Sequence, residues 1–290
     1  MKEEKEEQPN TDNDNSLKVQ PVEIDESKFN AIDYGIWTFP SFHIHIGAVA
    51  AGKSTLLHNY ITRFLYPIFE NRIILFSPTA HNDPLTMDLI ENENIFIHFN
   101  DYTNETLQRV LEVIAEDGKD NKKDGKDGID RWLIIFDDIL GQLPRVGSRE
   151  AKFFNKFVST YRHGAGIAPE GSISCMIFTQ KFSDCNNVIR TNCSYYNFLG
   201  SHSEKHIDQY SEELSGVFGG DDEKFKEIYN EAKTGGKYDF LCLDFRKLRA
   251  YKNFDTLLYD RDTVNENNEN FKNEKKELEE KTLLNNKKDE

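Results

Sequence analysis

The stretch "FHIHIGAVAAGKSTLLHNY" (residues 42–60) decides the fold, because it contains a complete phosphate-binding loop motif. Gly47, four further residues and then Gly52-Lys53-Ser54 match the pattern G-x-x-x-x-G-K-[ST]. An apolar-alternating run precedes the motif, and a segment with helical spacing of apolar residues follows it, which is the strand–loop–helix context that the motif requires. The stretch predicts a nucleoside triphosphate site. It does not say which of the many classes of phosphate-loop protein this chain belongs to.

Each part of the loop has an expected role at the phosphates. Backbone N–H groups in a glycine-rich turn can point at phosphate oxygens, and the dipole of the following helix adds a favourable potential there. We expect Lys53 to neutralise charge on the β- and γ-phosphates and the Ser54 hydroxyl to ligate Mg²⁺. The predicted nucleotide-binding residues are Gly47, Ala48, Val49, Ala50, Ala51, Gly52, Lys53, Ser54 and Thr55.

Length and composition restrict the class of protein. A chain of 290 residues can form one large α/β domain with tails, or two small domains. It contains no run of eighteen apolar residues and no apolar segment near its start, so we expect neither a membrane span nor a secretory signal. The four cysteines, Cys175, Cys185, Cys193 and Cys242, lack C-x-x-C spacing. We interpret them as reduced thiols of a cytosolic-type compartment rather than as disulfides or a zinc site.

The net charge of −15 argues against a broadly basic DNA-binding surface. Part of this charge lies in the ends: residues 1–26 carry three lysines and nine acidic residues, and residues 261–290 carry seven basic and nine acidic residues. The remainder of the chain is still acidic, so any DNA contact must come from a few basic residues on loops.

Composition also predicts the domain organisation. Residues 1–30 read as an acidic disordered tail, and residues 259–290 as a charged low-complexity tail that can form a helix. Residues 31–258 form the predicted ATPase domain. Within it, "GKDNKKDGKDG" (118–128) is expected to be a mobile insert.

Between the tails the chain alternates apolar and amphipathic segments. Strands are predicted at 42–47, 72–77, 94–99, 131–139, 172–180, 194–200 and 238–245, and helices at 54–69, 104–116, 149–161, 203–214 and 222–233. This alternation predicts an α/β fold with a mostly parallel, twisted sheet and helices on both faces. Ligands of such sheets bind at the carboxyl ends of the strands, where the phosphate loop also lies.

The segment "WLIIFDD" (132–138) is the second nucleotide motif. Its apolar residues deliver Asp137 and Asp138 to the carboxyl end of a buried strand. We expect Asp137 to hold the Mg²⁺ shell and Asp138 to orient or deprotonate the attacking water. The alternative is an ordinary acidic strand end. "NKKD" (121–124) and "DILG" (138–141) imitate the guanine and switch motifs of GTPases, but they occur in the wrong order, which argues against a GTPase.

The stretch that discriminates among phosphate-loop proteins is "TYRHGAGIAPEGSISCMIFTQKFSDCNNVIRTNCSYYNFLG" (160–200). The sequence resembles the FtsK–HerA superfamily in an ordered set of features. These are the phosphate loop, "IIFDD", "YRH", a strand ending in Gln180, and "R-x-N" at Arg190 and Asn192. The most similar members are the poxvirus-type genome-packaging ATPases of large DNA viruses, virophages and related transposons. The shared features span about residues 40–200.

The resemblance implies a RecA-like, FtsK–HerA-type fold. It also implies a homo-oligomeric ring that hydrolyses ATP with Mg²⁺ and pulls double-stranded DNA into a preformed capsid, in contact with a capsid or portal-type protein. The location would be the host cell cytoplasm, at the virus factory, and also the virion. The acidic strand ends in Asp-Asp where many cellular relatives have Asp-Glu.

Three more residues complete the candidate catalytic set. Gln180, at the tip of the strand beside the acidic one, can sense the γ-phosphate or position water. An arginine supplied by a neighbouring subunit stabilises charge in the transition state; Arg162 is the first candidate for that role and Arg190 the second. The alternatives are a capped strand end for Gln180 and surface ion pairs for the arginines.

Other functions remain open from the sequence alone. The chain could be another DNA translocase or helicase of the same superfamily, a small-molecule kinase, or a scaffold that binds ATP without useful turnover. The segment 141–153 carries Arg145, Arg149 and Lys152 just past the acidic strand. It is either a pore loop that contacts DNA phosphates or a solvated connection.

Overall fold

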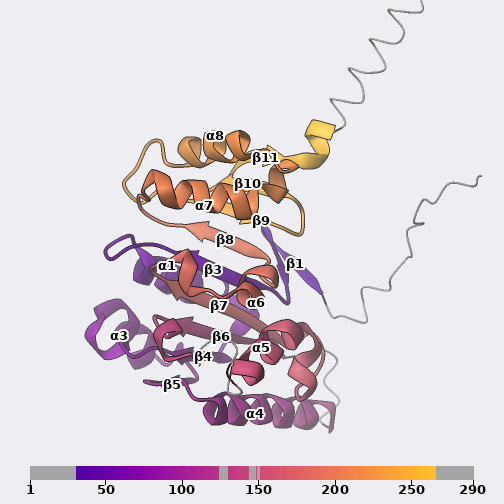
Figure 1. Cartoon of the computed structure of the whole chain (residues 1–290). Coiled ribbons are helices and arrows are strands. Elements are labelled where there is room, and N and C mark those ends of the chain that lie inside the picture. Colours follow the sequence, from indigo (N-terminus) through magenta and orange to yellow (C-terminus); the bar gives the residue numbers. More distant parts are fainter. Residues whose placement is uncertain (1–30, 124–129, 144–147, 149–150, 266–290) are drawn as a thin grey trace, which may run out of the picture.

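The fold is built on a nine-stranded sheet (Figure 1). A computed structural model describes residues 31–123, 130–143, 148 and 151–265. The strands, in spatial order, are β11 (Thr256–Asp260), β10 (Arg249–Lys252), β9 (Leu241–Asp244), β8 (Tyr195–Phe198), β3 (Phe42–Ile46), β7 (Ile173–Thr179), β6 (Trp132–Asp137), β4 (Ile73–Phe76) and β5 (Ile97–Phe99). The six strands from β8 to β5 are parallel, and β9, β10 and β11 add antiparallel pairs at one edge. The predicted mostly parallel α/β fold is confirmed.

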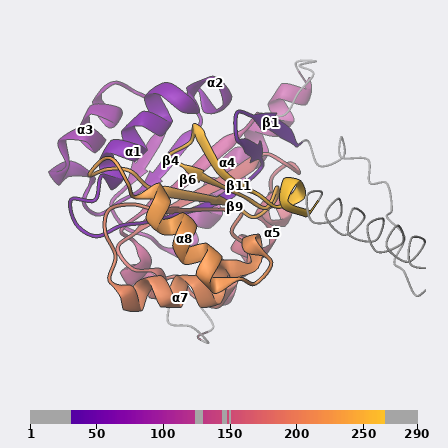
Figure 2. The ribbon, with the colours of Figure 1, turned by 90° about the horizontal axis from the view of Figure 1, so that it is seen from above.

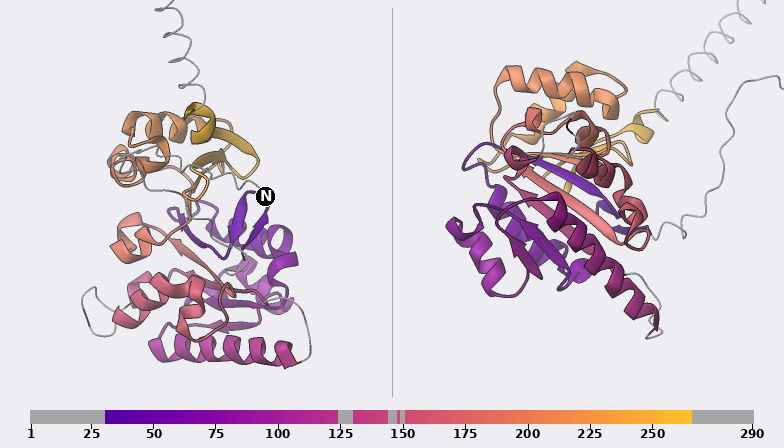
Figure 3. Two further views of the ribbon diagram at one scale, coloured as in Figure 1. Left: turned by 90° about the vertical axis from the view of Figure 1, so that its right-hand side faces the viewer. Right: turned by 60° about the horizontal axis from the view of Figure 1, so that its bottom comes forward.

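Helices cover both faces of this sheet (Figures 2 and 3). One face packs against α1 (Lys53–Asn59), the π-helical segment η2 (Tyr60–Phe64), α2 (Tyr66–Phe69) and α3 (Pro84–Glu91). The other packs against α4 (Asn104–Lys123), α5 (Ala151–Thr160), α6 (Asn187–Thr191), α7 (Glu204–Leu214) and α8 (Asp222–Ala232). Short 3₁₀ turns are η3 (Ala80–Asn82), η4 (Leu140–Gln142), η5 (Tyr161–Gly166), η6 (Phe182–Asp184) and η7 (Ser215–Phe218). None of the helices in the described part of the chain is long and apolar enough to cross a bilayer.

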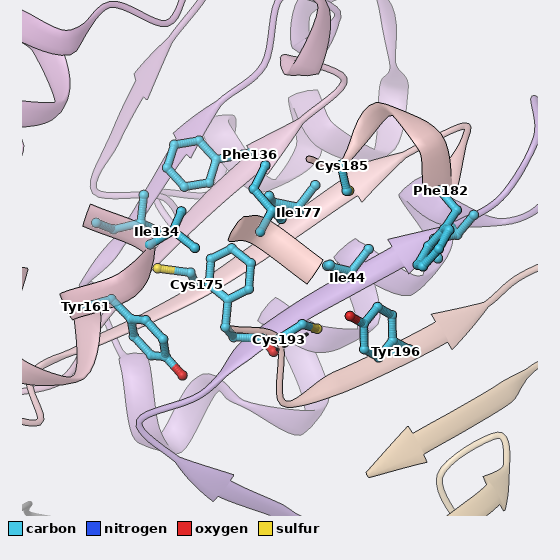
Figure 4. Packing of buried hydrophobic residues seen from close by; sticks show 14 of the residues in the cluster. Ile44, Ile134, Phe136, Tyr161, Cys175, Ile177, Phe182, Cys185, Cys193 and Tyr196 are labelled. Carbon is cyan, nitrogen blue, oxygen red and sulfur yellow. Dashed lines mark hydrogen bonds between the residues drawn. The ribbon is translucent and has the colours of Figure 1, made fainter. Parts of the chain in front are cut away.

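Strand β4 and residues 132–136 of β6 are apolar throughout because both of their faces are buried, whereas β3 also buries His43 and His45. In β6, Ile134 and Phe136 point into one core, whereas Leu133 and Ile135 point into the other. Figure 4 shows the first of these cores, in which Ile134 and Phe136 lie near side chains of β3 and β7. Strands that are buried on both faces give the continuous apolar runs seen in the sequence, and this explains why they were predictable.

Two hairpins were absent from the sequence prediction. The first joins β1 (Ile32–Tyr34) to β2 (Trp37–Phe39), and the second joins β10 to β11. They meet through aromatic residues: Phe254, in the turn of the second hairpin, packs edge-on against Trp37 of the first, with ring centroids 4.9 Å apart. Residues of both hairpin turns, among them Gly35 and Phe254, lie near Gly52 of the phosphate loop.

The prediction of a mobile insert at 118–128 is wrong for residues 118–123, which are the last turns of α4. Within this helix Gly118 permits close packing, because a Cβ there would lie only 2.5 Å from Cγ of Pro169. Residues 124–128 lie outside the described residues. At the other boundary, β11 continues to Asp260, two residues into the segment expected to be a tail.

Candidate functional site

The phosphate loop lies between β3 and α1, at the carboxyl edge of the parallel strands. The N–H of Gly47 donates to the backbone oxygen of Thr179, at 3.0 Å, which ties the start of the loop to the end of β7. A Cβ at Gly47 would lie 2.9 Å from Cβ of Ala51 and 3.1 Å from Cβ of Leu199. Gly52 caps α1 with a φ of 94°, a left-handed conformation that glycine adopts without strain. The motif glycines are therefore required by sterics.

Lys53 reaches back across this loop. Its Nζ donates to the backbone oxygen of Gly47 at 2.8 Å and to that of Ala48 at 3.3 Å. The ammonium group therefore lies at the mouth of the loop, close enough to Asp137 to lower the pKa of that carboxyl. This is the place where a cation can offset the charge of terminal phosphates.

The two acidic residues lie at the same edge as the loop. Strand pairing sets Asp137 of β6 opposite Phe178 of β7, and Thr179 of β7 opposite Ile46 of β3. Asp138 follows with a φ of 50°, which turns the chain sharply, and its N–H donates to the oxygen of Phe178 at 3.1 Å. The register therefore brings the acidic strand end and the phosphate loop to one edge, with only the end of β7 between them.

Asp137 is held by a residue that the sequence analysis missed. The hydroxyl of Ser77, which follows β4, donates to Oδ2 of Asp137 at 2.9 Å. Burial raises the pKa of Asp137 to about 6, and Asp138 adds to this shift, whereas the Ser77 hydrogen bond and the Lys53 charge oppose it. Ser77 is the first polar residue after the apolar run of β4, so its position at a strand end was the available signal.

These oxygen donors fit a magnesium ion. Mg²⁺ is bound through one or two carboxylates together with substrate phosphates and water. Asp137 offers a half-buried carboxylate whose charge is destabilised by burial, and the half-buried Ser54 lies in the first turn of α1, directly after Lys53. Ser54 and Asp137 are therefore the residues that would hold the ion.

The raised pKa gives a prediction about stability. Asp137→Asn is expected to stabilise the protein without nucleotide or Mg²⁺ by about 1–2 kcal/mol at pH 7.5, because it removes a charge that burial disfavours. This stabilisation is smaller than the free energy that corresponds to the whole pKa shift, because the carboxylate is only half-buried and water screens its charge.

The pH dependence of this effect follows from the direction of the shift. Between about pH 4 and pH 6, the folded chain holds a proton on Asp137 that the unfolded chain has released, so wild-type stability falls as pH rises through that window. The advantage of the variant should therefore disappear near pH 4. Denaturant unfolding at pH 4.5 and 7.5 measures it, and a variant less stable than wild type at pH 7.5 would contradict the assignment.

Gln180 lies directly after β7, at the same carboxyl edge. Its side chain is exposed and makes no hydrogen bond to any other described residue, so it does not cap the strand. Lys181 follows it with an exposed side chain, a cation at this edge that the sequence analysis did not single out.

The two candidate arginines lie in different surroundings. Arg162 is exposed and is the second residue of η5, where its backbone oxygen accepts from the N–H of Gly171 just before β7. It therefore lies at the amino edge of the sheet, roughly 20 Å along β7 from the phosphate loop of its own chain. Arg190 is held within the chain: its Nε lies 2.8 Å from Oε2 of Glu213, and its Nη1 donates to the oxygen of Cys185 at 2.7 Å.

The candidate DNA loop is placed only in part. Arg145 and Arg149 lie outside the described residues, whereas Lys152 is exposed in the first turn of α5. All four cysteines are buried, and each is a free thiol.

Comparison with known proteins gives structural matches. No protein-family model and no curated protein sequence matches the chain. Among solved structures, it is similar to B204, the DNA-packaging ATPase from Sulfolobus turreted icosahedral virus, with a TM-score of 0.52 and 14% identity over 74% of this chain and 97% of that one. The genome-packaging NTPase B204 from Sulfolobus turreted icosahedral virus 2 matches in complex with AMPPCP (TM-score 0.51) and with AMP (TM-score 0.50), each at 12% identity over 73% of this chain and 96% of that one. These matches confirm the phosphate-loop NTPase fold that the family resemblance implied.

Proposed function

We propose that this protein is an ATP-driven translocase of double-stranded DNA that packages a viral genome into a preformed capsid. The observation that carries the proposal is the meeting of the phosphate loop, Asp137–Asp138 and Gln180 at one sheet edge, in a fold shared with a viral packaging NTPase. The structural relatives include chains bound to an ATP analogue and to AMP, which supports ATP as the substrate here.

In the proposed mechanism, the loop N–H groups and Lys53 hold the phosphates. Ser54 and Asp137 would hold Mg²⁺, which would supply positive charge at the phosphate oxygens. Asp138 orients the attacking water or takes its proton, and the exposed Gln180 positions that water or senses the γ-phosphate. Catalysis of this kind depends mainly on positioning and electrostatics, and the fixed strand register provides the positioning.

The proposed assembly is a homo-oligomeric ring in which each site is completed by a neighbour. Arg162 is exposed and far from its own loop, so it can act only on another chain. Linear double-stranded DNA would pass through the ring towards a capsid or portal-type protein, in the host cytoplasm or at the virion.

The experiment that tests this function is the ATPase rate with and without linear duplex DNA. A translocase should hydrolyse ATP faster when DNA is present, because DNA is what it moves. A small-molecule kinase or a nucleotide-gated scaffold should show no stimulation. Lys53→Ala is the matched control, since it removes turnover in both conditions if the rate belongs to this site.

DNA affinity is expected to fall with salt, but with a shallow slope. The chain is acidic overall, so only a few basic loop residues can neutralise phosphates, and each contributes about −0.9 to the log–log slope. If the 141–153 segment reaches DNA, Arg145→Ala with Arg149→Ala should flatten the slope by about 2. Fluorescence anisotropy of a labelled duplex between 50 and 200 mM salt measures it, and an unchanged slope would move the contact to another loop.

A further inference from the structure

An apolar cavity of about 650 Å³ opens beside the phosphate loop. Gly52 and Thr55 form part of its wall, so it touches the loop and the first turn of α1. The remainder is largely aromatic and comes from the two hairpins and their neighbours: Trp37, Phe64, Tyr238, Phe240 and Phe254. Its volume is in the range of pockets that bury a small organic ligand. The sequence alone predicts no residue that contacts the base of the nucleotide.

The sheet order places this cavity opposite the carboxylates. From β3, which feeds the loop, the acidic strand β6 lies two positions away in one direction, beyond β7. The cavity residues Leu199, Phe240 and Phe254 lie in the other direction, directly after β8, directly before β9 and after β10, respectively. A nucleotide whose terminal phosphates face Asp137 therefore directs its base towards the cavity.

Tyr238 is an exposed aromatic residue at the rim of the cavity. Its side chain is 59% exposed, yet its ring lies against the loop, because a Cβ at Gly52 would be 3.3 Å from its Cδ1. The segment that carries it is fixed by Asp239, which pairs with Nζ of Lys252 at 2.9 Å and accepts from the Asn253 amide at 3.2 Å. The Nζ of Lys237 lies over this ring, 5.1 Å from its centroid, so a base would stack on the opposite face.

The cavity has few polar groups left for reading the edges of a base. The Asn253 oxygen already accepts from the N–H of Phe240 at 3.2 Å, and the Asn59 amide is engaged within α1 and η2. The indole nitrogen of Trp37 is buried, and Asp255 is exposed to water. A mainly apolar site with so few such groups discriminates weakly between ligands that differ only in polar substituents.

We infer that this cavity binds the nucleobase by stacking on Tyr238, and that it accepts ATP and GTP alike while holding pyrimidine nucleotides more weakly. The inference rests on the proposed function, since it assumes a triphosphate on the loop. Every base has a π-face, so stacking tolerates changes at the base edges, and the larger purines cover more of the aromatic surface.

The test is equilibrium binding of ATP, GTP, UTP and inorganic tripolyphosphate, each with Mg²⁺, to the full chain. We expect wild-type affinities for ATP and GTP within about threefold of each other, and UTP weaker. Tyr238→Ala should weaken ATP and GTP by about 5- to 100-fold and leave tripolyphosphate unchanged. Tyr238→Phe keeps the ring and should retain wild-type affinity. Phe96→Ala, at an aromatic that is 54% exposed elsewhere on the molecule, is the matched control.

Three outcomes would overturn the inference. Equal loss of ATP and tripolyphosphate in Tyr238→Ala would place the tyrosine at the phosphates, and no loss of either would remove it from the site. A wild-type preference for ATP over GTP above 100-fold would mean that base edges are read. If wild type bound neither ATP nor tripolyphosphate, the phosphate site itself, and with it the proposed function, would fail. Failure of the proposed function can be told apart from failure of the base site, because in the latter case the wild-type chain still binds tripolyphosphate.

Discussion

Arg162→Ala is expected to bind ATP with wild-type affinity and to release phosphate about 10³- to 10⁵-fold more slowly. An exposed guanidinium at the amino edge of the sheet has no route to its own phosphate loop, and burying it unpaired would be costly. If it instead completes the site of a neighbouring chain, it contributes only to the transition state, so the loss falls on turnover and spares binding.

Mixing variants separates this role from an effect on folding. Arg162→Ala chains retain an intact phosphate loop, and Lys53→Ala chains retain Arg162. A mixed oligomer therefore contains some interfaces at which an intact loop meets an intact Arg162. Phosphate release should therefore recover when the two inactive variants are combined.

Arg190→Ala is the comparison at the second candidate arginine, because Arg190 is paired with Glu213 and its guanidinium lies 5.0 Å from the ring centroid of Phe182. Its loss is expected to lower stability through these contacts. If mass measurements confirm mixed oligomers but phosphate release does not recover, Arg162 is not the arginine supplied to the neighbouring chain. Arg190 would then be tested in the same way, followed by the exposed Lys181 at the carboxyl edge.

Asp138→Asn is expected to lose about 10²- to 10⁴-fold in hydrolysis while it continues to bind MgATP. Asp138 follows the strand in a left-handed turn, one residue beyond the carboxylate that contacts Ser77. An amide at this position cannot accept a proton from water, although it preserves the shape of the side chain.

Asp137→Asn should show the opposite pattern, with weaker Mg²⁺-dependent binding. Single-turnover hydrolysis and nucleotide affinity, measured with and without Mg²⁺ for both variants, separate the two roles. If both variants lost binding equally, the two carboxylates would share the metal and the base would lie elsewhere.

The parts of the fold that were predictable have a direct physical signature. Parallel strands buried on both faces leave continuous apolar runs such as "IILF" and "WLIIF", and the carboxyl ends of those strands must meet at one edge. The sequence therefore placed Lys53, Asp137, Asp138 and Gln180 at the same edge without knowledge of the strand order.

The remaining features depend on tertiary contacts that leave no local pattern. The short strands around Trp37 and Tyr251 have no long apolar run. Their two hairpins meet through the rings of Trp37 and Phe254, which lie far apart in the sequence. Tyr238 is one aromatic among many in the sequence, and only the folded chain places it against Gly52. Likewise, the ion pair of Arg190 with Glu213 joins two helices whose packing the sequence does not specify.

The central claim is that ATP hydrolysis at this site moves the chain along duplex DNA. A triplex-displacement assay tests it most directly, because a translocating protein removes a third strand that lies in its path. With ATP, the wild-type chain is expected to release the third strand at a rate that depends on the length of duplex leading to it. Release should be absent with a non-hydrolysable analogue or with Asp138→Asn, although both still allow binding. Hydrolysis that is active and stimulated by DNA but never displaces the strand would contradict the account.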